Sequence, residues 1–168
     1  MADELKGAAY HEAGHAVTSH VLGERTFTLI TIEPNDQCEG RVQYEPMPDW
    51  FQPEYDMTPR KEALIRAEVV SFFAGACAQG FIDGPSEAEE SSYGDYTKAA
   101  NLASYAVGEH ELGAYLKGSA QEAERLVDLH RPAIDALAGA LLTKRTLTGD
   151  EARAIIGSNL KLAGELEE

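Results

Sequence analysis

The order of hydrophobic and polar positions predicts a helix followed by a small sheet at the start of the chain. From about Asp3 to Leu22 the sequence is rich in alanine and free of proline, and Gly23 follows as a typical helix terminator. Residues 26–33 and 40–45 are β-branched and aromatic and are separated by turn-forming residues, which predicts a β-hairpin.

The middle of the chain predicts a loop, a long helix and a break. Prolines crowd residues 46–59, which favours an extended loop. Residues 58–82 predict a long, largely buried helix with Pro59 in its first turn. Glycine, proline and serine end this pattern at 82–93, where the acidic run at 87–90 is interpreted as a solvated loop.

The last third of the chain predicts further helices. A helical pattern resumes at 95–107, and a second long helix is predicted over 119–144, with Pro132 as a kink or an early break. Thr148 and Glu151 have the spacing of a capping box for a last short helix. The sequence therefore predicts a mainly α-helical fold with a small β-sheet or hairpin.

These elements form one predicted domain over residues 1–160, followed by an acidic C-terminal tail over 161–168. The chain has 168 residues, of which 43% are hydrophobic, and is long enough to bury a core without disulfide crosslinks. Cys38 and Cys77 are its two cysteines, and their spacing indicates no disulfide framework. We therefore expect a reducing, cytoplasmic location.

The charge and the apolar content of the chain exclude some classes of function. The 29 acidic and 14 basic residues give a formal net charge of −15, which repels phosphate backbones, so nucleic acid is not an expected partner. The N-terminus lacks the basic head of a secretory signal. No segment approaches the ~20 apolar residues that cross a bilayer, so we expect no membrane insertion.

The strongest chemical signal is the motif His11-Glu12-Ala13-Gly14-His15 inside the first predicted helix. Two histidines four residues apart share one helix face, so both imidazoles can bind one zinc ion. Zinc lowers the pKa of a water that it binds, and a carboxylate beside it can take the proton and deliver it to a leaving amine. The motif predicts a zinc metalloendopeptidase of the HExxH type with Glu12 as its base. A pair of histidines held by ordinary hydrogen bonds is the simpler alternative.

A catalytic zinc ion needs a third protein ligand. His20 is excluded, because it lies nine residues from His11 and therefore on the opposite helix face. Spacing alone does not choose among the other side chains, which are His110, His130, Asp83, Glu87, Glu89, Glu90 and Asp95. Asp95 also has a structural interpretation, because an acid at the start of a helix caps it or complements its dipole.

Five segments follow one another in an order that is typical of one protein family. They are AYHEAGHAV at 9–17, ITIEP at 30–34, AGACAQGFIDG at 74–84, SSYGDYTKAANLASYAV at 91–107 and LHRPAIDALAGALLTKRTLTGDEARAII at 129–156. In this order they resemble the peptidase domain of FtsH-type AAA+ zinc metalloproteases over almost the whole chain.

The resemblance implies an FtsH-like peptidase fold with a zincin-type active-site helix. In that family the two motif histidines and an aspartate at the start of a later helix bind zinc, and the motif glutamate is the catalytic base. Carried over to this chain, the resemblance implies that His11, His15 and Asp95 bind Zn²⁺ and that Glu12 is the base.

The chain departs from the family pattern near the end of the long central helix. The family usually shows Gly-Gly-Arg followed by Ala-Glu, where this chain has Ala-Gly-Ala-Cys-Ala-Gln at 74–79. Gln79 can support a ligand histidine by a hydrogen bond but carries no charge. The missing arginine and glutamate motivate an alternative function, a catalytically inactive binding or regulatory module. The retention of both motif histidines, Glu12 and Asp95 argues against this alternative.

The sequence also lacks the phosphate-binding motif G-x-x-x-x-G-K-[ST] and a membrane anchor. We therefore expect an ATP-independent enzyme that cleaves peptides or unfolded segments, or one that depends on a separate unfoldase partner. The family implies a hexamer, and a dimer or a monomer stays open.

Two further expectations concern substrate binding. A peptide can lie along a sheet edge as an extra strand, and either strand of the predicted hairpin is a candidate for that edge. The alternative is that these strands only cover the active-site helix. Trp50, Phe51 and Tyr55 are interpreted as loop anchors packed on the core, with a side-chain pocket or lid as the alternative.

Overall fold

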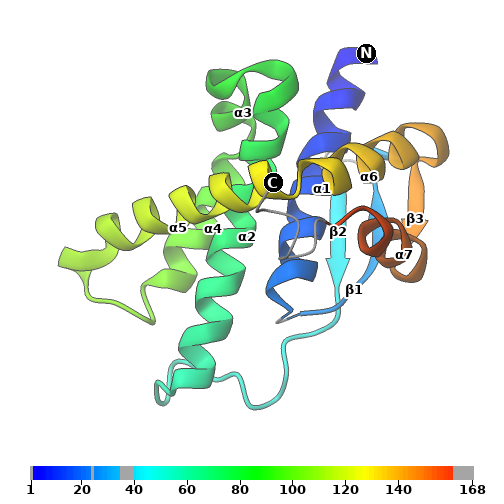
Figure 1. The fold of residues 1–168 in the computed structure, drawn as a ribbon. Helices are drawn as coiled ribbons and strands as arrows, with labels where there is room; N and C mark the ends of the chain where they lie inside the picture. The colour runs from blue at the N-terminus through cyan, green and yellow to red at the C-terminus, as the bar shows by residue number, and fades with distance from the viewer. Residues whose placement is uncertain (1, 24, 35–39, 161–168) are drawn as a thin grey trace, which may run out of the picture.

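The computed structural model describes residues 2–23, 25–34 and 40–160. Within these ranges the chain forms helices around a small antiparallel sheet, which confirms the predicted fold class (Figure 1). In chain order the elements are α1 (Ala2–Leu22), β1 (Phe27–Thr31), β2 (Arg41–Tyr44), α2 (Pro59–Asp83), α3 (Pro85–Ser91), α4 (Tyr93–Ala103), α5 (Glu109–Leu129), α6 (Arg131–Lys144), β3 (Thr146–Thr148) and α7 (Gly149–Asn159).

Helices α1 and α2 lie side by side and antiparallel at the centre of the molecule (Figure 1). Small residues allow this close approach. A Cβ atom on Gly14 would overlap the carbonyl oxygen of Ala74 and would lie 2.7 Å from the Cβ atom of Ala78. The contact presses the motif-bearing face of α1 against α2.

The sheet has the order β2-β1-β3, and both pairings are antiparallel. Ile30 at its centre pairs with Val42 on one side and with Leu147 on the other. The predicted hairpin is confirmed. The third strand was not predicted, because three residues are too few to give an alternating pattern.

Two hydrophobic clusters among the described residues stabilise the fold, and α2 and α5 contribute to both. The first joins the sheet to α1, α6 and α7 through fully buried side chains that include Val17, Phe27, Ile30, Ile32, Ile134, Leu137, Leu141 and Ile156. The second joins α2 to α4 and α5 through Ile65, Val69, Ala99, Ala103 and Leu116. The second cluster fixes α4 against α2, and α4 carries Asp95 in its first turn.

The interpretation of 87–90 as a loop is wrong, because these residues lie in the short helix α3. Gly84 ends α2 with a φ of 88°, a left-handed conformation that favours glycine. Pro85 then begins α3, and Ala88 is buried. Burial of the Ala88 side chain stabilises the helical conformation of this otherwise polar segment.

The single helix predicted over 119–144 is also wrong. The structure has two helices, α5 and α6, and Pro132 in the first turn of α6 marks a break rather than a kink. Helix α5 begins ten residues earlier than predicted, at Glu109, because Leu112 and Leu116 pack on the second cluster.

Side-chain caps define two of the helix starts. The hydroxyl of Thr58 accepts a hydrogen bond from the Lys61 backbone N–H before α2. Thr148 and Glu151 form the predicted capping box before α7, which confirms that expectation.

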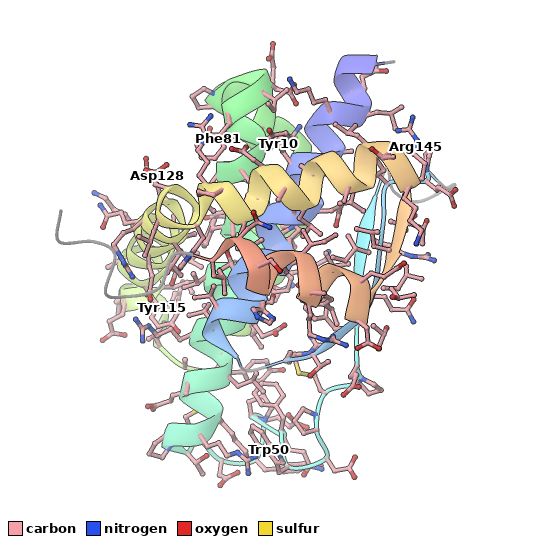
Figure 2. All side chains as sticks on the ribbon, turned by 45° about the vertical axis from the view of Figure 1, so that its right-hand side comes forward. Tyr10, Trp50, Phe81, Tyr115, Asp128 and Arg145 are labelled. Atoms are coloured by element: carbon pink, nitrogen blue, oxygen red, sulfur yellow. The ribbon has the colours of Figure 1, made fainter. Side chains whose placement is uncertain are left out.

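The segment between β2 and α2 is a loop, as predicted. The buried ammonium group of Lys61 donates to the carbonyl oxygen of Gln52 and to Asp56, which fastens the loop to α2. Phe51 packs on the second cluster, and the Trp50 ring lies 3.9 Å from the Arg60 guanidinium (Figure 2). Both therefore anchor the loop.

The anchor interpretation is wrong for Tyr55, which is 80% exposed. None of Trp50, Phe51 and Tyr55 lines the cleft described below, so the alternative of a side-chain pocket there has no support from the structure.

Helix α2 corrects one further expectation. By length and composition alone it is apolar enough to cross a membrane, although no segment was expected to approach that composition. Half of its most apolar window is buried inside the protein, and Glu68 and Ser71 are buried on it. These are properties of a core helix.

Cys77 on α2 is free and half-buried, and burial raises the pKa of its thiol to about 11. Cys38 and the predicted acidic tail over 161–168 lie outside the described residues.

The contact of α1 with α2 gives a prediction. Gly14→Ala should lower the free energy of unfolding by about 1–3 kcal/mol, because the added methyl group forces the two helices apart. Chemical denaturation followed by circular dichroism measures the change. Gly118→Ala on α5 is the matched control, because its methyl group meets nothing within 4 Å and the better helix propensity should stabilise the protein. Equal stability of the two variants would contradict the packing argument.

Candidate functional site

Three ligand-type atoms converge where α1, α2 and α4 meet. His11 and His15 lie one turn apart on α1, and their Nε2 atoms are 3.0 Å apart. Asp95 comes from the first turn of α4, and its Oδ2 atom lies 3.1 Å from Nε2 of His11 and 3.2 Å from Nε2 of His15. Among the described residues, these are the one group of His, Cys, Asp and Glu side chains close enough to hold a metal ion.

Helix α2 orients both imidazole rings through their other nitrogen. Nδ1 of His15 lies 2.7 Å from the carbonyl oxygen of Ser71, and Nδ1 of His11 lies 2.9 Å from Oε1 of Gln79. Both partners accept hydrogen bonds only, so both Nδ1 atoms carry the hydrogen and donate it. When both rings are neutral, their Nε2 lone pairs therefore point at each other and at Asp95.

With both rings neutral, three acceptor atoms face one another at 3.0–3.2 Å, and they repel each other unless a cation lies among them. The triangle has a radius of only about 1.8 Å, so one ion can reach all three atoms at the ~2.0–2.1 Å of zinc–nitrogen and zinc–oxygen bonds. Two imidazoles and one carboxylate form a donor set that suits zinc and leaves a position open. The chemistry of the site thus fits a divalent metal ion.

Asp95 does not cap its helix. The N-cap position of α4 is Ser92, and no side chain makes a capping hydrogen bond there. The second carboxylate oxygen of Asp95 lies 3.0 Å from the ammonium group of Lys98. One oxygen therefore faces the histidines while the other is held by an exposed cation.

Glu12 lies in the same cleft and is only 6% exposed. The start of β2 approaches it closely, because a Cβ atom on Gly40 would lie 2.9 Å from Glu12 Cγ. The Val42 backbone hydrogen-bonds to the Glu12 carboxylate. Burial raises the pKa of Glu12 to about 7, against the lowering influence of His11. The strand thus holds this carboxylate in place and shields it from bulk water.

The cleft that contains these groups has a volume of about 570 Å³ and lies between α1, α2, α4 and β2. Its lining includes Tyr44, Glu68 and Ser71, besides the cluster itself. Tyr44 and Ser71 both hydrogen-bond to Ser19, at 2.9 and 2.8 Å.

Glu68 pairs with Arg25 at 2.8 Å, and burial raises the pKa of Glu68 despite this partner.

The structure separates the other candidate ligands from the cluster. Glu87 and Glu89 are exposed on α3, and His110 is exposed on α5. His130 is buried at the junction of α5 and α6. Glu90 has no described side chain, and Asp83 meets Gln79 rather than the histidines.

Sequence reasoning missed several residues that shape the site. Glu68, Ser71, Gly75 and Gln79 follow one another at helical spacing on the face of α2 that meets α1. The sequence contains that spacing, but only the packing of α2 against α1 shows that these residues face the site. Of the four residues, Gln79 alone was considered.

Two histidines on one helix turn, an adjacent glutamate and a carboxylate from a later helix are the side chains that a zincin-type metal centre requires. No protein-family model matches the chain. Curated relatives do match, and they are FtsH zinc metalloproteases. The chain is thus similar in sequence to these proteases, which confirms the resemblance predicted from the sequence, and its helical fold is consistent with an FtsH-like peptidase domain.

The relatives cover most of this chain, whereas the chain covers a small part of each relative. The ATP-dependent zinc metalloprotease FTSH 6, chloroplastic, of Arabidopsis thaliana is 28% identical over 88% of this chain and 26% of its own length. FtsH of Trieres chinensis is 25% identical over 89% and 29%. FtsH of Mycoplasma pneumoniae is 31% identical over 60% and 13%. The chain spans about a quarter of the length of the first two relatives.

Gly75 gives a prediction for the metal centre. A Cβ atom at this position would lie 2.5 Å from Nε2 of His15 and 2.8 Å from Nε2 of His11, where the ligand atoms meet. Gly75→Ala should therefore weaken the binding of Zn²⁺ or Co²⁺ by more than about tenfold, because the methyl group displaces both rings. Competition with a chromogenic chelator measures the affinity.

Gly80→Ala, five residues along the same helix, is the control, because its methyl group would meet nothing closer than 3.9 Å. Gly75→Ala protein that binds metal as tightly as Gly80→Ala protein would contradict the assignment of the site.

Proposed function

We propose that this domain is a zinc metalloendopeptidase of the HExxH type that hydrolyses peptide bonds in peptides or unfolded segments. One observation carries the proposal: three metal-ligand atoms converge beside a buried glutamate in one cleft. The names of the curated relatives support zinc and proteolysis.

In this proposal His11, His15 and Asp95 hold the zinc ion and Glu12 acts as the general base. When bound, zinc polarises the scissile carbonyl and makes a water molecule acidic enough to be deprotonated near neutral pH. Glu12 accepts the proton of the attacking water at its carboxylate and then delivers a proton to the leaving amine. Gly40 and Val42 keep the carboxylate turned into the cleft during both transfers.

Strand β2 is the proposed docking edge for the substrate. The central strand β1 is paired on both sides and offers no free edge. Strands β2 and β3 are the two outer strands, and β2 lines the cleft at Arg41, Val42 and Tyr44. A peptide that adds a strand to β2 gains main-chain hydrogen bonds beside the metal ligands. Only an extended segment can bind in this way, which favours peptides and unfolded chains as substrates.

An extended substrate needs no prior unfolding, so we propose that hydrolysis by this chain is independent of ATP. The rate of cleavage of a short peptide should not change when ATP and Mg²⁺ are added. A rate that rises with ATP would overturn this part of the proposal.

Glu12→Gln tests the role of the base. The variant should retain zinc and lose about 10²–10⁴-fold in turnover, because a carboxamide cannot accept the proton of the attacking water. Hydrolysis of fluorescently labelled, denatured casein and zinc content by atomic absorption are the two measurements. Glu89→Gln, at an exposed position on α3, is the control and should behave as the parent does.

Full activity of Glu12→Gln would refute the assigned mechanism. Zinc-loaded parent protein that cleaves neither casein nor an unbiased peptide library would favour the inactive binding or regulatory module.

Asp95→Ala tests the third ligand. Zinc affinity should fall by more than about tenfold, because a catalytic zinc site needs three protein ligands. Lys98→Ala is the control, since it removes the ion partner of Asp95 but leaves all three ligand atoms. Isothermal titration calorimetry compares the variants, and equal zinc affinity of the two would show that the third ligand lies elsewhere.

A further inference from the structure

The cleft contains a second buried glutamate that the proposed chemistry does not use. Glu68 on α2 lines the cleft and is only 6% exposed. It lies two helical turns before Gly75, the residue beside the ligand atoms, which corresponds to about 10 Å along the helix axis. Glu68 is therefore too far away to bind the metal ion but near enough to contact a side chain of a bound substrate.

One carboxylate oxygen of Glu68 is held by the protein, and the other is not. Nη1 of Arg25 donates to Oε2 of Glu68 at 2.8 Å, and Arg25 does not line the cleft, so it holds the carboxylate from outside. The cations that line the cleft are placed differently, because Lys98 pairs with Asp95 and Arg41 is exposed. Within the described part of the chain, Oε1 of Glu68 has no hydrogen-bond or ion-pair partner.

A row of hydroxyl groups makes Tyr44 a second acceptor in this part of the cleft. Oη of Tyr44 lies 2.9 Å from Oγ of Ser19, which lies 2.8 Å from Oγ of Ser71. Ser71 in turn donates to the carbonyl oxygen of His15 at 3.3 Å. Because each hydroxyl has one hydrogen and a carbonyl oxygen only accepts, all three contacts are hydrogen bonds only if each hydroxyl donates along the row. The hydrogen of Tyr44 is then used inside the row, and its oxygen can only accept from a ligand.

Phe72 adds an apolar surface beside these acceptors. Glu68 and Phe72 are four residues apart on α2, so they share one helix face, and both line the cleft. The Phe72 side chain is half-buried. Lysine and arginine combine an apolar stem with a cationic group that only donates hydrogen bonds, which matches an aromatic surface next to two acceptors.

We propose that Glu68 and Tyr44 form a specificity pocket that binds a lysine or arginine side chain of the substrate close to the scissile bond. The inference deepens the proposed function and rests on it for the cleavage of that bond. A substrate strand added to β2 presents every second side chain to the cleft, at intervals of about 7 Å. A residue within two positions of the scissile bond can therefore reach Glu68 with the four-carbon stem of lysine.

The first test uses peptides that differ only in one ammonium group. A short peptide that the parent cleaves at one bond receives lysine, or norleucine with its uncharged straight side chain, at each of the two positions on either side of that bond. At one of these positions kcat/KM should be at least about tenfold higher for lysine, because its ammonium group hydrogen-bonds to the carboxylate. Glu68→Gln should remove most of this ratio, since the amide keeps the shape of the side chain but not its charge.

Glu122→Gln is the matched control for the loss of charge. Glu122 also pairs with an arginine, Arg66, at 2.7 Å, but it lies on α5 and does not line the cleft. This control should keep the lysine-to-norleucine ratio of the parent.

Tyr44→Phe is a second variant, which keeps the ion pair between Arg25 and Glu68 and should lower the ratio less than Glu68→Gln does. A merely structural role of that ion pair would change the denaturation midpoint of Glu68→Gln protein but not its ratio.

The second test measures binding without turnover. Fluorescence anisotropy gives the affinity of zinc-loaded Glu12→Gln protein for the labelled lysine and norleucine peptides. Lysine should be preferred at the same position as in the first test, and the preference should disappear when Glu68→Gln is added. If the parent cleaves no peptide, the parent itself is used in this measurement.

The inference is overturned if lysine has no advantage over norleucine at any position, if Glu68→Gln protein keeps the preference of the parent, or if neither peptide binds. Parent protein that cleaves no peptide but binds the lysine peptide more tightly, in a way that Glu68→Gln abolishes, would refute the proposed function and leave this inference intact.

Discussion

The close contact between α1 and α2 is the constraint on which the rest of the structure depends. The small residues Gly14, Ala74 and Gly75 allow the backbones of the two helices to approach closely. At that distance the carbonyl oxygen of Ser71 contacts Nδ1 of His15, and the side chain of Gln79 contacts Nδ1 of His11. A larger residue between α1 and α2 would separate the helices or fill the site itself. Small residues at this contact are therefore required both for the packing of the core and for the geometry of the candidate metal site.

Each element around the cleft supplies a different part of the chemistry. Helix α1 supplies His11, His15 and Glu12, α2 orients the two imidazole rings, α4 supplies Asp95, and β2 covers Glu12. The arrangement concentrates acceptors in a protein whose formal net charge is already −15. Mutual repulsion among these groups is the electrostatic cost of the site, and a bound divalent cation offsets it where the repulsion is greatest.

The sequence correctly predicts those elements that depend on interactions between residues close together in the chain. The alanine-rich first helix, the hairpin and the capping box at Thr148 each depend on residues within a few positions of one another. Helix α3 and the early start of α5 depend instead on burial against distant elements, at Ala88 and Leu116, which a local pattern does not contain. The HExxH spacing points to two ligands, but Asp95 is eighty residues from His15 and spacing alone left it among several acids. Only the family resemblance distinguished it.

The division of the interior into two hydrophobic clusters has a thermodynamic consequence. His11 and His15 belong to a helix packed in the first cluster, whereas Asp95 belongs to a helix packed in the second. An ion held by all three would act as a crosslink between two clusters that α2 and α5 also join. Its binding free energy then adds to the cohesion of the whole molecule, because neither cluster can open without losing a ligand.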